Sequence, residues 1–259
     1  MTKKLRIVLA TSSYPSAMYF VESVCREKNV AGIIFEEKRG RKESILRVLK
    51  RTRKLGLLKA IDELIFYFSK RFLLGKGKAF SKTNDAYIDN IPICYVKNIN
   101  DTEAKNFIRK LKADVLVVYG VSILKDEIIS ILPKGVLNMH PGITPEYRGL
   151  DPLFWSIINK DFDKIGATIH FIDKGVDTGP VIVQNTIDVR RNDSYATLFE
   201  KVLKEGINSM IAALTLVEND AVKIINRQKS SSRLYTRPGI SNYLAYRKGM
   251  KTLRESRNL

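Results

Sequence analysis

The sequence predicts a doubly wound, Rossmann-like α/β fold with a mostly parallel sheet, and three observations support this. Apolar, β-branched runs of strand length alternate with segments of helical apolar spacing over most of the 259 residues. The runs at 114–119 and 135–139 are continuously apolar, as in strands buried on both faces. Hydrophobic residues make up 44% and charged residues 28%, which is typical of a globular protein with a sizeable core.

The expected elements follow from these patterns in chain order. Apolar or alternating runs predict strands at 5–10, 31–35, 93–96, 114–119, 135–139, 166–172 and 181–189. Helical spacing predicts helices at 16–27, 101–111, 125–131 and 194–217. The polar turn expected at 11–15 has no glycine-rich fingerprint, so a dinucleotide cofactor is not supported.

Two basic segments interrupt or follow this α/β pattern. We expect a catalytic α/β domain at 1–217 with a basic helical insertion at about 38–80, in which 43–54 and 57–74 have helical apolar spacing. A short extension at 218–259 is expected to form a β-hairpin over 221–236 and then a basic helix.

The net charge of +18 is concentrated in these segments. Residues 38–78 contain 14 Lys/Arg against 3 Asp/Glu, and residues 221–259 contain 10 against 1, so the rest is close to neutral. Localised charge favours an anionic ligand, an anionic lipid surface or RNA, although solvated helix faces explain such runs equally well.

Cysteine usage and hydropathy indicate the compartment. Cys25 and Cys94 are too few for a disulfide framework, which favours a reducing cytoplasm. The apolar run before residue 10 is too short for a secretory signal, and no stretch reaches the roughly 18 apolar residues of a membrane span.

Three polar residues stand where doubly wound sheets carry their chemistry. Asn138 and His140 come at the end of a buried strand, and the carboxyl ends of strands face the ligand crevice. They share one side if the strand reaches His140, because they are two residues apart. Asp177 lies in a glycine-bracketed loop that can return a carboxylate over the same crevice.

An amide, a histidine and a carboxylate form a set suited to acyl transfer. Asn138 and a protonated His140 can donate hydrogen bonds to an oxyanion. Asp177 can keep His140 charged and relay protons, because a nearby negative charge raises a histidine's pKa. Singly, each also has a structural reading as a loop or turn residue. His170 alternates within a strand and is expected to be structural, and one His with one distant Asp gives too few ligands for a metal.

Three motifs resemble those of the folate-dependent formyltransferase family. The run from Asn138 to Gly149 (NMHPGITPEYRG) resembles the family signature, and GVDTG at 175–179 resembles its downstream loop. DVLVVYGVSI at 114–123 resembles the strand and loop whose backbone holds a pteridine ring. The chain departs from the pattern where many members have one serine and then two leucines, at Gly142, Ile143 and Thr144.

The resemblance, strongest over 114–185, implies a Rossmann-like enzyme that uses 10-formyltetrahydrofolate as co-substrate and no metal. It implies that Asn138, His140 and Asp177 are the catalytic residues. The residues that it places at the cofactor are Tyr119, Gly120, Val121, Ile123, Gly175 and Val176.

The acceptor amine depends on the branch of the family. The turn at 11–15 replaces the glycine-serine-asparagine phosphate loop of the glycinamide ribonucleotide branch. The residues after 217 are too few for the C-terminal barrel of the methionyl-tRNA branch. We therefore expect formylation of a nucleotide-linked amino sugar for bacterial surface polysaccharide (O-antigen or lipopolysaccharide), with those two branches as alternatives. Ser12, Ser13 and Arg148 are the candidate acceptor residues.

The resemblance and the basic segments also suggest partners. Members with short tails often dimerise through a terminal strand pair, so a homodimer is expected. The insertion suits a pyrophosphate or an anionic membrane surface. Nucleic acid is disfavoured because the aromatic residues at 66–72 have helical spacing that suits packing. A non-enzymatic RNA-binding or membrane-surface protein that uses the basic helices remains the alternative from another class.

Overall fold

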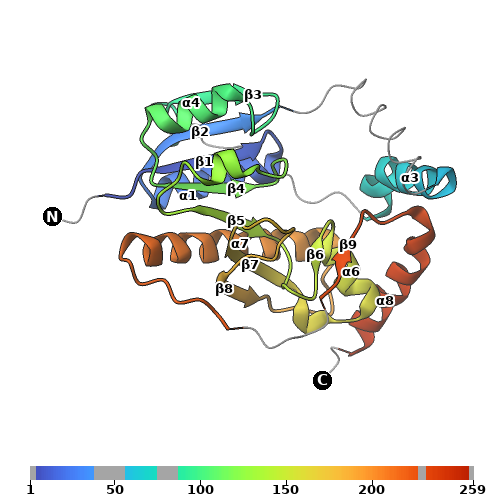
Figure 1. The fold of residues 1–259 in the computed structure, drawn as a ribbon. Helices are drawn as coiled ribbons and strands as arrows, with labels where there is room; N and C mark the ends of the chain where they lie inside the picture. The colour runs from blue at the N-terminus through green and yellow to red at the C-terminus, as the bar shows by residue number, and fades with distance from the viewer. Residues whose placement is uncertain (1–3, 38–55, 75–86, 227–231, 257–259) are drawn as a thin grey trace.

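A seven-stranded sheet forms the centre of the protein (Figure 1). The computed structural model describes residues 4–37, 56–74, 87–226 and 232–256. The strand order is β3-β2-β1-β4-β5-β7-β8, with parallel pairing from β3 to β5 and antiparallel pairing of β7 with both neighbours. The strands are β1 (Ile7–Ser12), β2 (Val30–Glu36), β3 (Ile93–Val96), β4 (Val115–Tyr119), β5 (Val136–His140), β7 (Gly166–Phe171) and β8 (Val181–Thr186). The predicted mostly parallel, doubly wound α/β fold is confirmed.

Helices cover both faces of this sheet, and further helices lie beside one end of it (Figure 1). The helices are α1 (Pro15–Glu27), α3 (Leu57–Leu73), α4 (Thr102–Lys110), α5 (Asp126–Ile129), α6 (Pro152–Asn159), α7 (Tyr195–Glu218) and α8 (Tyr243–Ser256), with 3-10 turns η2 (Phe162–Lys164) and η3 (Ile240–Asn242). One core lies between the sheet and the α1 and α7 helices, and a second lies between the sheet and α4 and α5.

The central strands are apolar on both sides because both faces of the sheet are covered. In β1, Ile7 and Leu9 belong to the first core, whereas Val8 and Ala10 belong to the second. The strand runs two residues further than the sequence predicted, since Thr11 pairs with β4 and Ser12 with β2. The predicted polar turn is therefore shorter, and two of its hydroxyls lie at the carboxyl end of the sheet.

The strand order reverses between β1 and β4. From β1 the chain goes outward to β2 and β3, and from β4 it goes outward the other way to β5. Ligands of doubly wound sheets bind at the carboxyl ends of the strands beside such a reversal. The ends of β1, β4 and β5 therefore mark the crevice, as the positions of Asn138 and His140 predicted.

The C-terminal strand pair was predicted wrongly. Residues 221–226 form no strand, and Ile225 N donates one hydrogen bond to Val181 O at 2.8 Å. The strand that does form, β9 (Leu234–Tyr235), pairs in parallel with β6 (Arg148–Gly149) from the catalytic signature. The edge of β6 provides the backbone hydrogen bonds of β9, so β9 does not need a hairpin partner. The homodimer expectation rested on that hairpin and gains no support from these residues.

A third core joins the insertion and the tail to the sheet domain. Phe66 of α3 packs edge-on against Phe154 of α6, with ring centroids 5.1 Å apart, and Phe154 stacks on Tyr246 of α8 at 5.0 Å. The predicted helices at 57–74 and in the tail are confirmed, and the helix predicted at 43–54 lies outside the described residues. The sequence reading missed α6, although Pro152 at its first turn is a common helix start.

Candidate active site

Asn138 and His140 project together from the end of β5. The strand continues to His140, so the two side chains lie on the face that Val136 buries in the second core. His140 is 4% exposed. The predicted placement at the carboxyl end of a buried strand is confirmed.

The loop between β7 and β8 returns Asp177 to the same place. Asp177 has a φ of 51°, a left-handed conformation that aspartate tolerates better than most residues. A side chain at Gly179 would meet the Phe171 carbonyl oxygen at 1.8 Å, so the loop can fold back closely only with glycine there. Asp173 Oδ1 accepts hydrogen bonds from Gly175 N at 2.9 Å and Thr178 Oγ1 at 2.6 Å. These contacts fix a loop that presents one carboxylate.

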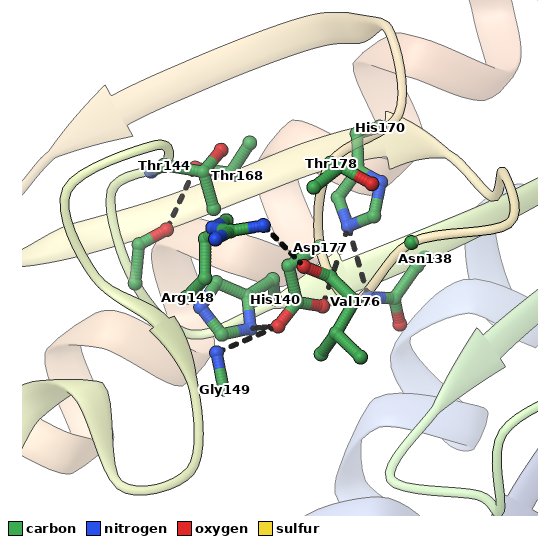
Figure 2. A network of polar contacts seen from close by, with 12 residues as sticks. Asn138, His140, Thr144, Arg148, Gly149, Thr168, His170, Val176, Asp177 and Thr178 are labelled. Carbon is green, nitrogen blue, oxygen red and sulfur yellow. Dashed lines mark hydrogen bonds and ion pairs between the residues drawn. The ribbon is translucent and has the colours of Figure 1, made fainter. Parts of the chain in front are cut away.

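Asp177 contacts both predicted partners (Figure 2). Its Oδ2 lies 3.5 Å from His140 Nδ1, and its Oδ1 accepts from Asn138 Nδ2 at 3.3 Å. Gly149 N also donates to Asp177 Oδ2 at 2.8 Å. The structure therefore brings together all three residues that the sequence singled out.

The environment of His140 favours a neutral ring. Its Nε2 lies 2.7 Å from the Tyr147 carbonyl oxygen, which only accepts, so Nε2 carries the hydrogen. Burial is the largest influence and lowers the pKa of His140; the charge of Asp177 and the Tyr147 hydrogen bond act against it without reversing it. This direction opposes the protonated His140 that the sequence predicted. Nδ1 is left as a basic nitrogen facing Asp177.

Asp177 is ionised. Burial is again the largest influence and opposes ionisation, but contacts with His170, His140 and Gly149 N outweigh it and lower the pKa of Asp177 to about 2. The Gly149 hydrogen bond is the firmest of these contacts, because it does not depend on the protonation of either histidine. A basic nitrogen thus lies beside a carboxylate that can stabilise it once it is protonated.

His170 belongs to this network, which the sequence reading missed. Its Nδ1 donates to the Phe171 carbonyl at 2.8 Å, so its Nε2 can accept from Asn138 Nδ2, 3.1 Å away. His170 Nε2 is also 3.7 Å from Asp177 Oδ1. The cause is strand register, because Asn138 and His170 are paired across β5 and β7. The expectation that His170 is only structural therefore needs correction: it orients the Asn138 amide.

The candidate acceptor residues differ in their surroundings. Arg148 Nη1 lies 3.3 Å from the Val176 carbonyl oxygen, and Arg148 Nε is buried without a hydrogen-bond partner among the described residues. Ser12 is buried and its hydroxyl donates to the Gly120 carbonyl at 2.8 Å, whereas Ser13 is exposed. Arg148 is therefore placed beside the Asp177 loop, while the Ser12 hydroxyl already holds the end of β4.

The predicted cofactor loop follows β4 and is held by polar contacts. The Tyr119 ring packs on Phe20 in the first core, so this residue can offer only its backbone to a ligand. Ile123 is 78% exposed. Of the remaining predicted cofactor residues, Gly120 has a left-handed backbone and Val121 is half-buried. Gly175 and Val176 are exposed residues of the Asp177 loop.

Two polar side chains that the sequence reading missed build this loop. Glu36 at the end of β2 accepts a hydrogen bond from Ser122 N at 2.7 Å. Asn100 donates to the Ile123 carbonyl at 2.9 Å and accepts from Lys125 N at 2.7 Å. Their position after neighbouring strands was the available signal. Among the described residues, no group of three His, Cys, Asp or Glu side chains could hold a metal ion.

Gly142→Ser tests why this chain departs from the serine of the family pattern. An added Cβ would lie 2.5 Å from Pro152 Cβ and 2.8 Å from His140 Nε2. Because the proline ring is rigid, we expect Gly142→Ser to lower the free energy of unfolding by about 1–3 kcal/mol. Chemical denaturation measures this. Ile143→Leu, a volume-conserving change at the next departure, should cost less, and equal stability of Gly142→Ser and wild type would contradict the prediction.

Gly149→Ala tests the link between the tail and Asp177. Gly149 has a φ of +93°, and its added Cβ would lie 2.3 Å from the Tyr235 carbonyl oxygen of β9. We expect a loss of about 1–3 kcal/mol in the free energy of unfolding. We also expect slower formyl transfer, the activity that the motifs imply, because the N–H group that donates to Asp177 moves. The exposed neighbour offers a control, since Leu150→Ala should change stability by at most about 0.5 kcal/mol. Unchanged turnover in a folded Gly149→Ala variant would show that the N–H is dispensable.

A buried imidazole, an ionised carboxylate and an oriented amide at the strand ends of an α/β sheet form a set of groups suited to acid–base chemistry on a bound ligand. The particular family follows from comparison with known proteins. Residues 75–214, more than half of the chain, match the formyl transferase family, so the chain belongs to the formyltransferases. The matched region contains Asn138, His140 and Asp177.

Curated relatives are about a third identical to this chain over the regions that align. The methionyl-tRNA formyltransferase of Desulforamulus reducens is 35% identical over 132 residues, which cover 50% of this chain and 41% of that protein. The methionyl-tRNA formyltransferase of Alkaliphilus oremlandii is 30% identical over 162 residues, which cover 61% and 52%. The chain thus spans about half the length of the curated relatives it matches.

Solved structures share the fold at lower identity. A phosphoribosylglycinamide formyltransferase from Anaplasma phagocytophilum has a TM-score of 0.60 at 19% identity, covering 90% of this chain and 98% of that one. A sugar N-formyltransferase from a Shewanella species has a TM-score of 0.56 at 16% identity, covering 92% and 78%. These similarities establish the fold and do not distinguish the acceptors.

Proposed function

We propose that this protein transfers a formyl group from 10-formyltetrahydrofolate to a primary amine. The observation that carries the proposal is the position of His140, whose Nε2 hydrogen bonds to the Tyr147 carbonyl and whose Nδ1 faces ionised Asp177. A neutral Nδ1 can take a proton from an attacking amine, and Asp177 then stabilises the imidazolium. No serine or cysteine has to be acylated in a direct transfer between two bound substrates.

The proposed reaction exchanges the formyl group between two nitrogen atoms. The amine nitrogen forms a bond to the formyl carbon, and the bond from that carbon to folate N10 breaks. One proton leaves the amine through His140 Nδ1, and one proton ends on folate N10. Asn138 Nδ2 has two hydrogens, which His170 Nε2 and Asp177 Oδ1 accept in the resting site. One of these bonds is exchanged for a hydrogen bond to the oxyanion that forms between these events.

Folate is proposed to lie against the loop that follows β4. The backbone of this loop is fixed by Glu36 and Asn100, and its exposed Ile123 offers an apolar surface to a flat ring. Gly175 and Val176, the exposed residues before Asp177, would close the opposite side.

For the acceptor we propose an amino sugar linked to a nucleoside diphosphate. The support is a cation beside the reactive carboxylate: Arg148 contacts the Asp177 loop through Nη1, and a guanidinium has further N–H groups that suit a phosphate oxygen. The turn at 11–15 also lacks the phosphate loop of the glycinamide ribonucleotide branch. Methionyl-tRNA is the second candidate, because the curated relatives cited above carry that name.

The experiment that tests both parts is a formyl-transfer assay with 10-formyltetrahydrofolate and a panel of nucleotide-linked amino sugars, with methionyl-tRNA as the competing acceptor. Mass spectrometry should detect one formyl group added to a sugar amine, and His140→Asn should abolish the product. If only methionyl-tRNA is formylated, the acceptor is methionyl-tRNA instead of a sugar, and the proposal of formyl transfer is retained. Transfer to no amine would overturn both parts.

A further inference from the structure

The apolar stripe of α3 faces outward. Its apolar residues recur with the helical spacing that normally turns one face toward a protein core. Yet Leu58 is 84%, Phe68 75% and Leu57 64% exposed. The other large apolar residues exposed on this helix are Ile61, Leu64, Ile65 and Tyr67. The helix projects from one end of the molecule beside α8 (Figure 1).

The carboxylates of α3 face the protein instead. Asp62 accepts hydrogen bonds from the N–H of Ser241 at 2.8 Å and from its hydroxyl at 2.7 Å, which ties the helix to η3. Glu63 is 4% exposed. Phe66 anchors the same side in the third core. The outward face that remains is apolar, and its carboxylates are turned inward.

A cavity of about 410 Å³ lies along one edge of the helix. It is lined by Leu58 and Asp62 from α3 and by Trp155 and Thr236 from the other side. This flank of α3 is therefore not closed by the described residues around it. The exposed stripe is a surface that lacks a covering element in the described part of the chain.

The charge of the sequence segment that includes α3 selects among possible occupants. Residues 38–78, which include α3, contain 14 Lys/Arg against 3 Asp/Glu. Arg237 lies over the Tyr67 ring at 5.4 Å and adds a cation at the edge. A second copy of this chain would bring the same positive segment against itself, which is unfavourable. An apolar face offers phosphodiester oxygens few donors, which disfavours RNA.

We propose that the outward face of α3 (Leu57, Leu58, Ile61, Leu64, Ile65 and Phe68) lies in the interface of a bilayer that contains anionic lipid. Apolar side chains enter the boundary between headgroups and acyl chains, and the described cations at this helix, Lys59 and Arg237, attract the lipid headgroups. Among the described helices none is long and apolar enough to cross a membrane, so the helix lies along the surface. This inference does not rest on the proposed function.

Vesicle co-sedimentation of the full chain tests the proposal. We expect binding to vesicles that contain phosphatidylglycerol, weaker binding to phosphatidylcholine alone, and weakening by salt. Leu58→Glu and Phe68→Glu should each reduce binding about tenfold or more, because each removes the burial of one large apolar side chain. Ile224→Glu adds the same charge at an apolar residue outside α3 that is 52% exposed, and it should bind like wild type.

The outcomes separate the occupants. Failure to bind anionic vesicles would overturn the proposal, as would equal losses in the Ile224→Glu control. Self-association in analytical ultracentrifugation that Leu58→Glu abolishes would assign the face to a second copy, and RNA retention lost in the same variant would assign it to RNA. Circular dichroism and thermal unfolding should be unchanged in both α3 variants, which shows that they fold.

Discussion

His140→Asn is expected to lower kcat for formyl transfer by about 10²–10⁴-fold, the usual contribution of a general acid–base group. The reason is that Asn has no nitrogen able to take the proton that the amine loses. Single-turnover measurements with saturating 10-formyltetrahydrofolate report the chemical step directly. A kcat within about threefold of wild type would remove His140 from the proton path, since general bases contribute far more than that.

The control for this prediction is retained structure. His140 is buried and bonds the Tyr147 carbonyl, so the variant must be shown to fold by circular dichroism and thermal unfolding. Folate binding should also survive, because the predicted folate loop after β4 does not touch the imidazole through any described contact. A variant that binds folate and does not transfer the formyl group isolates the loss to the chemistry.

Asp177→Asn is expected to lower kcat by about 10²-fold or more. It should also shift the acid limb of the curve of kcat against pH. His140 must be neutral to accept a proton, so activity falls as the pH drops through the lowered pKa of His140, below about pH 6.5. The charge of Asp177 raises that pKa, and its removal lowers it further. The acid limb of Asp177→Asn should therefore lie at lower pH than that of wild type. An unmoved limb would mean that Asp177 only positions the loop.

The same substitution should lower stability at neutral pH. The pKa of Asp177 is lowered to about 2 in the folded protein, so its stabilisation is present above the unfolded value of about 4 and is lost as the pH falls toward 2. Urea unfolding should show a lower stability of Asp177→Asn than of wild type at pH 7, and this difference should shrink as the pH falls from about 4 through 2. A constant difference would contradict the linkage.

The local patterns of the sequence were enough to predict the sheet, and the resemblance to the formyltransferase motifs singled out the three central residues. The continuous apolar runs at 114–119 and 135–139 required a two-sided cover of helices, which fixed the fold class. The two-residue spacing of Asn138 and His140 at a strand end fixed their common direction. These features depend on neighbours along the chain, so no knowledge of distant contacts was needed.

Errors arose where a residue's role depends on a distant partner. His170 was read as structural because the sequence does not reveal that β7 runs antiparallel beside β5 in the register that pairs it with Asn138. The tail was read as a hairpin because β6, with only Arg148 and Gly149, is too short to recognise as its partner. The charge of His140 was misjudged because the depth of burial that lowers its pKa is set by residues from several elements.

The sequence by itself determined the chemical groups of this formyltransferase-family site and the strand ends that carry them, because backbone periodicity and residue type are local properties. Only the tertiary structure decided how those groups work. It lowered the pKa of His140, added His170 to the network, and joined the tail to Asp177 through Gly149. It also turned the apolar face of α3 outward. The physical reason is that burial, register and electrostatic coupling are sums over atoms far apart in the chain.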